Sequence, residues 1–276
     1  MRCTFLVSVA LFVLLLTLSV ASAESIRIMP LGDSITLGYS AASEENDYMI
    51  GYRQKLYLDL LGRGYDIEFV GSLLSGMLAQ PSFDADHEGR AGWCADDCDP
   101  PYEGLTDHIY NFLAENPADV ILLHIGTNDI GMDLQDPSAV GRLLDEIDRY
   151  SRDIIVVLAR IIRRTDKLPE VTTEYNDGVE ALALDRMANG DRIMLVDMEN
   201  ALNYHDDMAD PLHPNQTGYN KMADVWLDAL AEIFSLANPE GITGTSSYLY
   251  GDFGPTGICQ YDGTPYRWTK ITPANP

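Results

Sequence analysis

Short apolar runs alternate with longer helical stretches along most of this chain of 276 residues. The run D-V-I-L-L-H-I, for example, is nearly continuous in its apolar character. Strands are predicted over 25–31, 67–71, 119–125, 153–161 and 192–197, and helices over 49–62, 104–115, 138–150, 171–187 and 218–236. Nearly continuous apolar strands that are separated by helices predict a parallel sheet covered on both faces. We therefore expect an α/β domain, a three-layer α/β/α sandwich with a parallel central sheet.

The first residues are expected to be removed from the mature chain. Arg2 supplies a short positive region, the stretch 5–20 is almost wholly apolar, and the A-S-A at 21–23 matches a cleavage site. A membrane anchor is the alternative, but the apolar run is short and no basic cluster follows it. We predict a signal peptide over 1–23, a secreted, extracellular protein, and no membrane association after cleavage.

The net charge of the chain excludes some partners, and its composition divides the rest of the chain into a domain and a tail. With 43 Asp and Glu against 18 Lys and Arg, the net charge of −25 would repel nucleic acid and anionic membranes. The main domain is expected over 24–237, and a tail rich in Gly, Tyr and Pro over 238–276. That tail is too poor in aliphatic residues for a domain of its own. It either wraps the main body or is partly disordered, and an aromatic, sugar-binding tail is the sharper alternative.

Three cysteines remain once Cys3 is cleaved off, and an oxidising compartment favours one disulfide. Cys94 and Cys98 lie close together in a turn-prone stretch, which favours a local bridge, although either could instead pair with Cys259. A zinc site at His87 and this cysteine pair would lack a second ligand pair. We predict neither a metal nor a cofactor.

Two candidate catalytic residues follow predicted strands, where open parallel sheets bind ligands. Ser34 lies in L-G-D-S-I-T-L-G, where the first strand gives way to a helix, and its backbone N–H can donate to an oxyanion. Serine is also a common helix cap at such a place. Asn128 lies in H-I-G-T-N-D after the third long strand, and its amide either points into the same crevice or stabilises its own turn.

The stretch D-P-L-H-P-N precedes the last predicted helix. Asp210 and His213 lie three residues apart in it, so the carboxylate can accept from Nδ1 and leave Nε2 facing the sheet. This is the base and its orienting carboxylate in a nucleophilic site. A polar loop before a helix that starts with proline would show the same residues.

Taken together, Ser34, Asn128 and the D-x-x-H pair occur in the order typical of SGNH (GDSL-type) hydrolases, which the chain resembles over about 25–236. The resemblance implies a flavodoxin-like sandwich and a Ser34–His213–Asp210 site. It also implies an oxyanion hole from the N–H groups of Ser34 and a glycine together with Asn128. Spacing favours Gly92 for the glycine, with Gly89 as the rival.

Several stretches are similar to the acetylxylan esterases of carbohydrate esterase family 3, namely I-M-P-L-G-D-S-I-T, Y-R-Q-K-L-Y, F-V-G-S, D-H-E-G-R-A-G-W and D-P-L-H-P-N. This implies removal of O-acetyl groups from acetylated polysaccharide or oligosaccharide. His87 and Glu88 are candidates to line the substrate cleft, or else to hydrogen-bond a turn. The cysteine pair and the tail depart from the family pattern.

These inferences predict a secreted, monomeric serine esterase that acts on O-acetylated carbohydrate through an acyl-enzyme. A lipid or lysophospholipid esterase of the same superfamily is the alternative enzyme. A carbohydrate-binding protein without catalysis is the alternative from another class, but a binder would have no need of Ser34, Asn128 and His213 together.

Overall fold

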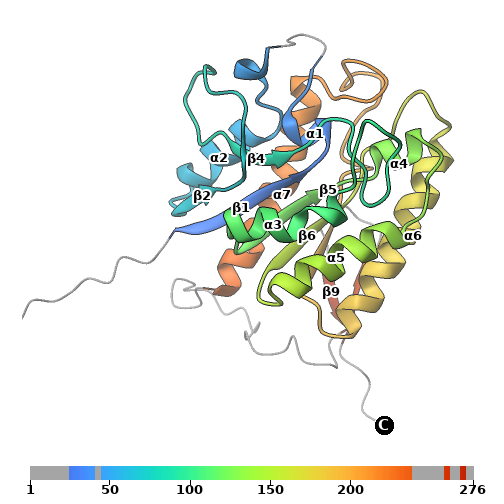
Figure 1. Ribbon diagram of the computed structural model, residues 1–276. Coiled ribbons are helices and arrows are strands. Elements are labelled where there is room, and N and C mark those ends of the chain that lie inside the picture. The colour runs from blue at the N-terminus through green and yellow to red at the C-terminus, as the bar shows by residue number, and fades with distance from the viewer. Residues whose placement is uncertain (1–24, 41–44, 238–257, 262–267, 272–276) are drawn as a thin grey trace, which may run out of the picture.

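The computed structural model describes residues 25–40 and 45–237, together with two short strands further along the chain. A seven-stranded sheet forms its middle layer (Figure 1). The strands are β1 (Ile26–Gly32), β2 (Ile67–Phe69), β3 (Leu73–Leu74), β4 (Asp86–Gly89), β5 (Val120–His124), β6 (Ile155–Arg160) and β7 (Ile193–Asp197). The order is β3-β4-β1-β5-β6-β7, and β2 pairs with the first half of β1. All pairs are parallel except β3 with β4, so the predicted parallel sheet is confirmed with one antiparallel edge.

Helices cover both faces of the sheet and complete the predicted sandwich. They are α1 (Ser34–Leu37), α2 (Arg53–Gly62), α3 (Ile109–Glu115), α4 (Thr127–Gly131), α5 (Ser138–Tyr150), α6 (Pro169–Ala188) and α7 (Gln216–Ala237), with short 3-10 turns at Asn46–Tyr48 and Leu105–Asp107. Figure 1 shows α3 and α5 in front of the sheet and α7 behind it.

The core consists of two apolar layers, one on each side of the sheet. Successive side chains of a strand point to opposite faces. Ile28 therefore packs with Leu56 of α2 and Trp226 of α7, whereas its neighbour Met29 packs with Leu143 of α5. This alternation explains why the strands are apolar along their whole length.

Two helices begin later than the sequence predicted. The helix expected over 49–62 starts at Arg53, because Gly51 has a φ of 52° and its backbone touches that of Gly38. The helix expected over 104–115 is divided into a 3-10 turn and α3. Strands β3 and β4 lie between the strand predicted over 67–71 and the helix predicted over 104–115, where no element was predicted. They are short, and β4 is the polar sequence Asp-His-Glu-Gly, which carries no apolar strand signal.

The ends of the chain bear on three predictions. The expected signal peptide lies outside the described residues. Of the tail, the structure describes β8 (Ile258–Tyr261) and β9 (Trp268–Ile271), which pair antiparallel. The predictions that the tail wraps the main body or binds sugar concern residues that lie largely outside the described ones. No helix in the described ranges has the length and apolar character needed to cross a bilayer.

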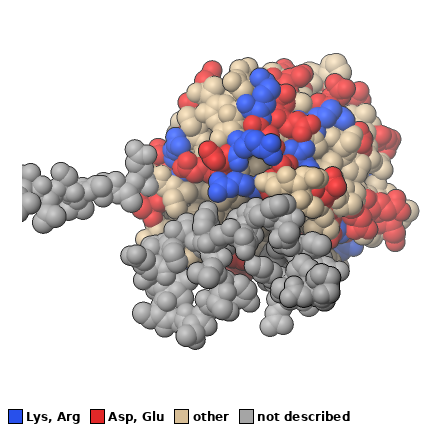
Figure 2. All heavy atoms as spheres, turned by 90° about the horizontal axis from the view of Figure 1, so that it is seen from below, with Lys and Arg blue, Asp and Glu red and all other residues tan. Residues whose placement is uncertain are grey.

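Charged residues of both signs share the surface despite the net negative charge. Arg27 pairs with Asp119 at 2.8 Å and Arg152 with Asp191 at 3.1 Å, in segments where strands begin. Figure 2 views the molecule from below and shows Lys and Arg side chains gathered among Asp and Glu. An ion pair exposed on both sides, such as Arg27–Asp119, contributes little to stability, typically about 0–1 kcal/mol.

Candidate active site

A chain of hydrogen bonds links Ser34, His213 and Asp210 at the carboxyl end of the sheet. Ser34 is the first residue of α1, directly beyond β1, and its Oγ lies 2.9 Å from His213 Nε2. His213 Nδ1 lies 2.8 Å from Asp210 Oδ2. The structure thus brings together residues separated by 179 positions in the sequence. A hydroxyl, a base and an orienting carboxylate in this order can generate a nucleophile.

The Asp210 carboxylate is fixed by its own loop. Its Oδ1 accepts hydrogen bonds from the backbone N–H groups of Leu212 at 2.7 Å and His213 at 2.9 Å. Partial burial raises the pKa of Asp210, but these two bonds and the one to the imidazole outweigh burial, so the net pKa is lowered. Asp210 therefore stays ionised and orients the imidazole.

Aromatic side chains pack around the base. The Tyr39 ring lies 4.5 Å from the His213 ring, centroid to centroid, and is tilted by 52°. Tyr219 of α7 donates its hydroxyl to Tyr39 O at 2.6 Å, which fixes the backbone that carries this ring. His213 is buried, with its ring held between Ser34, Asp210 and Tyr39.

Two backbone N–H groups are candidate oxyanion donors. The first N–H groups of a helix have no intrahelical acceptor, so Ser34 N–H is available at the start of α1. Gly92 lies in a turn at φ 83°, and within the described part of the chain its N–H has no acceptor. The same turn is attached to β1, because Arg90 N–H donates to Gly32 O at 2.8 Å. Gly89 differs from Gly92 in that its N–H donates to His87 Nδ1 at 2.9 Å.

Asn128, the second residue of α4, reaches the same turn. Its Nδ2 donates to Trp93 O at 2.8 Å, and an amide nitrogen carries a second hydrogen that this bond does not use. Because Trp93 adjoins Gly92, the bond ties the Asn128 side chain to the turn that holds the free N–H. The geometry therefore favours Gly92 over Gly89 as the third donor.

His87 and Glu88 do not face a cleft. Both side chains are fully buried. The Glu88 carboxylate accepts from Ser72 N at 2.8 Å and pairs with Arg90, while burial lowers the pKa of His87 to about 2. Since no surface of either side chain is left for a substrate, the expected cleft-lining role is not supported. Their hydrogen bonds instead hold the turn that leads to Gly92.

The predicted disulfide between Cys94 and Cys98 is present, with Cα atoms 5.5 Å apart. It closes a small loop directly after the Gly92 turn. The backbone N–H of Ala95 inside this loop donates to the Asp129 carboxylate at 3.1 Å, so the loop is tied to α4.

A group of buried polar side chains beneath the site escaped the sequence analysis. Asp33 caps α1 by accepting from Ile35 N at 2.9 Å, and its other carboxylate oxygen has no hydrogen-bond partner among the described residues. Burial above all, and the nearby Asp129 carboxylate to a smaller extent, raise the pKa of Asp33 to about 7. Burial also raises the pKa of Asp129 to about 6. The only sequence signal was an acidic residue beside Ser34 and another beside Asn128.

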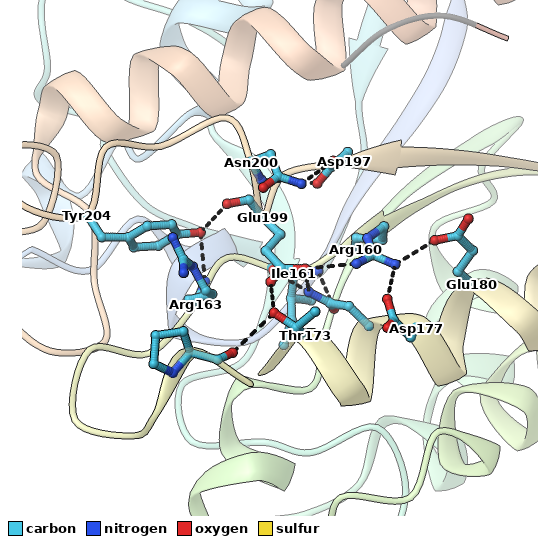
Figure 3. A network of polar contacts seen from close by, with 12 residues as sticks. Arg160, Ile161, Arg163, Thr173, Asp177, Glu180, Asp197, Glu199, Asn200 and Tyr204 are labelled. Carbon is cyan, nitrogen blue, oxygen red and sulfur yellow. Dashed lines mark hydrogen bonds and ion pairs between the residues drawn. The ribbon is translucent and has the colours of Figure 1, made fainter. Parts of the chain in front are cut away.

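A second buried group supports the loop that precedes Asp210 (Figure 3). Arg160 at the end of β6 pairs with Glu199 at 2.9 Å and with Glu180 at 2.5 Å. Tyr204 donates its hydroxyl to Glu199 O at 2.6 Å and accepts from the backbone N–H of residue 163 at 2.9 Å.

The segment beyond β6 then connects this network to the loop that carries Asp210 and His213. Thr165 N–H donates to Pro211 O at 2.8 Å, and the Arg164 guanidinium donates to Thr127 O at 2.9 Å. Residues 164 and 165 thus contact both the loop that carries His213 and the start of the helix that carries Asn128.

The family follows from a match of the chain to the model of the GDSL-like lipase/acylhydrolase family over residues 31–221. The chain belongs to this family. Membership places it among the carboxylic ester hydrolases, and the match spans Ser34, Asn128 and His213.

Individual relatives are esterases as well. A multidomain esterase from Ruminococcus flavefaciens is 27% identical over an alignment of 262 residues that covers 85% of this chain and 32% of that protein. The chain thus spans about a third of this relative's length. A Clostridium thermocellum family 3 carbohydrate esterase superposes with a TM-score of 0.64 at 29% identity, covering 76% of this chain and 99% of that one. A family 3 carbohydrate esterase from Talaromyces cellulolyticus has the same fold, with a TM-score of 0.62 at 21% identity over 76% and 98% of the two chains.

Proposed function

We propose that this protein is a secreted esterase that removes O-acetyl groups from carbohydrate through an acyl-enzyme on Ser34. The observation that carries the proposal is the hydrogen-bonded series from Ser34 Oγ through His213 to Asp210, with its 2.9 Å and 2.8 Å contacts. The names of the relatives from C. thermocellum and T. cellulolyticus support a carbohydrate ester as substrate. The N-terminal apolar run supports secretion.

In the first half of the reaction, His213 Nε2 takes the proton of Ser34 as Oγ attacks the ester carbonyl carbon. The negative charge that forms on the carbonyl oxygen is stabilised by the N–H groups of Ser34 and Gly92 and by the Asn128 amide. The tetrahedral intermediate collapses as the bond to the sugar oxygen breaks. His213 then gives its proton to that oxygen, which leaves an acetyl group on Ser34.

In the second half, water takes the place of the sugar hydroxyl. His213 removes one proton from the water, whose oxygen attacks the acetyl carbon and forms the second tetrahedral intermediate. Its collapse releases acetic acid, which ionises to acetate in solution, and His213 returns its proton to Ser34 Oγ. Asp210 stays ionised throughout and stabilises the imidazolium that forms in both halves.

The test is acetate release from acetylated xylan by the mature protein, compared with Ser34→Ala. The proposal predicts that acetate release is lost in Ser34→Ala and kept in the control Ser235→Ala, an exposed serine near the end of α7. Acetate release that persists in Ser34→Ala would overturn the proposed nucleophile.

A long-chain ester is the second candidate substrate, and one observation favours it. Leu74, Met77 and Leu78 are each more than half exposed, in a segment that Gly76 attaches to Asn46 O by a 2.8 Å hydrogen bond. Cleavage of a long-chain p-nitrophenyl ester without acetate release from xylan would keep the mechanism and replace the carbohydrate by a lipid.

A further inference from the structure

Tyr102 lies directly on the glycine that we assign to the oxyanion hole. A Cβ atom at Gly92 would collide with the Tyr102 ring carbons Cδ1 and Cε1, so the ring packs against the backbone of Gly92. The positive φ of Gly92 and this contact both exclude a larger residue there. Although it is in contact with Gly92, Tyr102 keeps 44% of its surface exposed.

The backbone around Tyr102 is held in place by several links. Tyr102 N–H donates to Asp99 O at 3.1 Å, and Cys94 N–H donates to Glu103 O at 3.2 Å. The Cys94–Cys98 disulfide closes the adjoining loop of residues 94–98 and constrains the backbone that leads to Tyr102. A ring presented by a constrained loop loses little conformational freedom on contact with a ligand, which favours binding.

The chemistry of an acetylated sugar matches this position. In such an ester a single oxygen separates the carbonyl carbon from the sugar ring. When the carbonyl oxygen accepts from Gly92 N–H, the sugar must therefore lie close to whatever covers Gly92. The faces of a pyranose carry C–H groups, which a flat aromatic ring can shield from water, while the tyrosine hydroxyl stays solvated.

We propose that Tyr102 is a stacking platform for the pyranose ring that carries the acetyl group, and so determines specificity for sugar esters over simple esters. The inference rests on the proposed function and deepens it. It concerns the segment that follows the cysteine pair, and this pair is a departure from the pattern of the family that the chain resembles.

The experiment measures kcat and KM of the mature protein and of Tyr102→Ala and Tyr102→Phe on two substrates. One substrate is an acetylated xylo-oligosaccharide, and the other is ethyl acetate, which has no ring to stack. In Tyr102→Ala we expect KM for the oligosaccharide to rise about tenfold, while kcat/KM for ethyl acetate stays within about twofold. Tyr102→Phe keeps the ring and should restore the oligosaccharide KM.

Leu61→Ala is the matched control, because Leu61 is also 44% exposed but lies near the end of α2 that precedes β2, away from Ser34. Leu61→Ala should leave kcat and KM unchanged for both substrates. A thermal unfolding midpoint of each variant shows whether the domain stays folded.

Two results would overturn the proposal that Tyr102 is a stacking platform. One is an oligosaccharide KM unchanged in Tyr102→Ala. The other is an equal loss on both substrates, which would mean that Tyr102 merely supports Gly92. Failure of the proposed function is distinguishable, since it would show in the wild-type protein as no acetate release from the oligosaccharide.

Discussion

Asp33→Asn should remove a pH-dependent loss of stability that arises from the buried carboxylate beside Ser34. Asp33 is fully buried, and its pKa is raised from 3.8 to about 7, chiefly by burial. Its titratable neighbours are Asp129, Tyr52, Tyr175 and Tyr219, none of which supplies a positive charge at neutral pH. Asparagine keeps the oxygen that accepts from Ile35 N and caps helices about as well as aspartate.

The sign and size follow from proton linkage. Between pH 3.8 and about 7 the folded protein holds a proton on Asp33 that the unfolded chain has released, so stability falls as the pH rises through this window. At 1.36 kcal/mol for each pH unit, the loss is at most about 4 kcal/mol. The Asp33→Asn variant would have no such loss, because an amide does not titrate.

The assay is urea unfolding of wild type and Asp33→Asn at pH 4.5 and pH 8, followed by tryptophan fluorescence. Titration of groups that do not interact with Asp33, such as the buried His87 and His124, cancels in the difference between the two proteins. We expect the stability of Asp33→Asn relative to wild type to rise by about 2–4 kcal/mol between the two pH values. Asp228→Asn, which removes an exposed carboxylate of α7, should show no such rise.

A relative stability of Asp33→Asn that is the same at both pH values would refute the reasoning. It would mean that Asp33 is ionised in the folded protein and that its unpartnered oxygen is solvated.

Other variants test separate parts of the structure. Arg160→Met leaves the buried Glu199 carboxylate without its cation, so it should lower the free energy of unfolding in urea by about 3–5 kcal/mol. The control Arg152→Met removes an exposed cation and should lower it by less than about 1 kcal/mol. Replacing Cys94 and Cys98 together by serine should lower the free energy of unfolding by about 2 kcal/mol, and an unchanged urea midpoint would contradict this. Asn128→Ala should lower kcat for acetate release about 10²–10³-fold with the fold intact by circular dichroism. A loss of less than tenfold would exclude its amide from the oxyanion hole.

Much of the fold could be predicted because most of the sheet is apolar on both faces. The strands β1, β5, β6 and β7 were found from their continuous apolar runs, and α5 from its helical pattern. β4 was missed because its buried side chains are polar, and their hydrogen bonds form only once the chain has folded. A residue such as Glu88 is normally exposed, so sequence alone gives no reason to bury it.

The candidate site could be predicted as far as it depends on the positions of its residues relative to the strands and the last helix. Ser34, Asn128, Asp210 and His213 each follow a strand or precede the last helix, and parallel topology brings such positions to one edge. The choice between Gly92 and Gly89 required the hydrogen bond from Gly89 N–H to His87. The burial of Asp33 and Asp129 could not be foreseen, because it depends on how distant segments pack around the starts of α1 and α4 in the folded domain.

Covalent labelling of Ser34 tests the central claim most directly. A small fluorophosphonate reacts with a serine that is activated by a neighbouring base and has oxyanion donors at hand. We predict that intact mass spectrometry of the mature protein shows one added label. Peptide mapping should locate that label at Ser34, and Ser34→Ala and His213→Ala should remain unlabelled. A label on any other residue, or equal labelling of Ser34→Ala, would contradict the account.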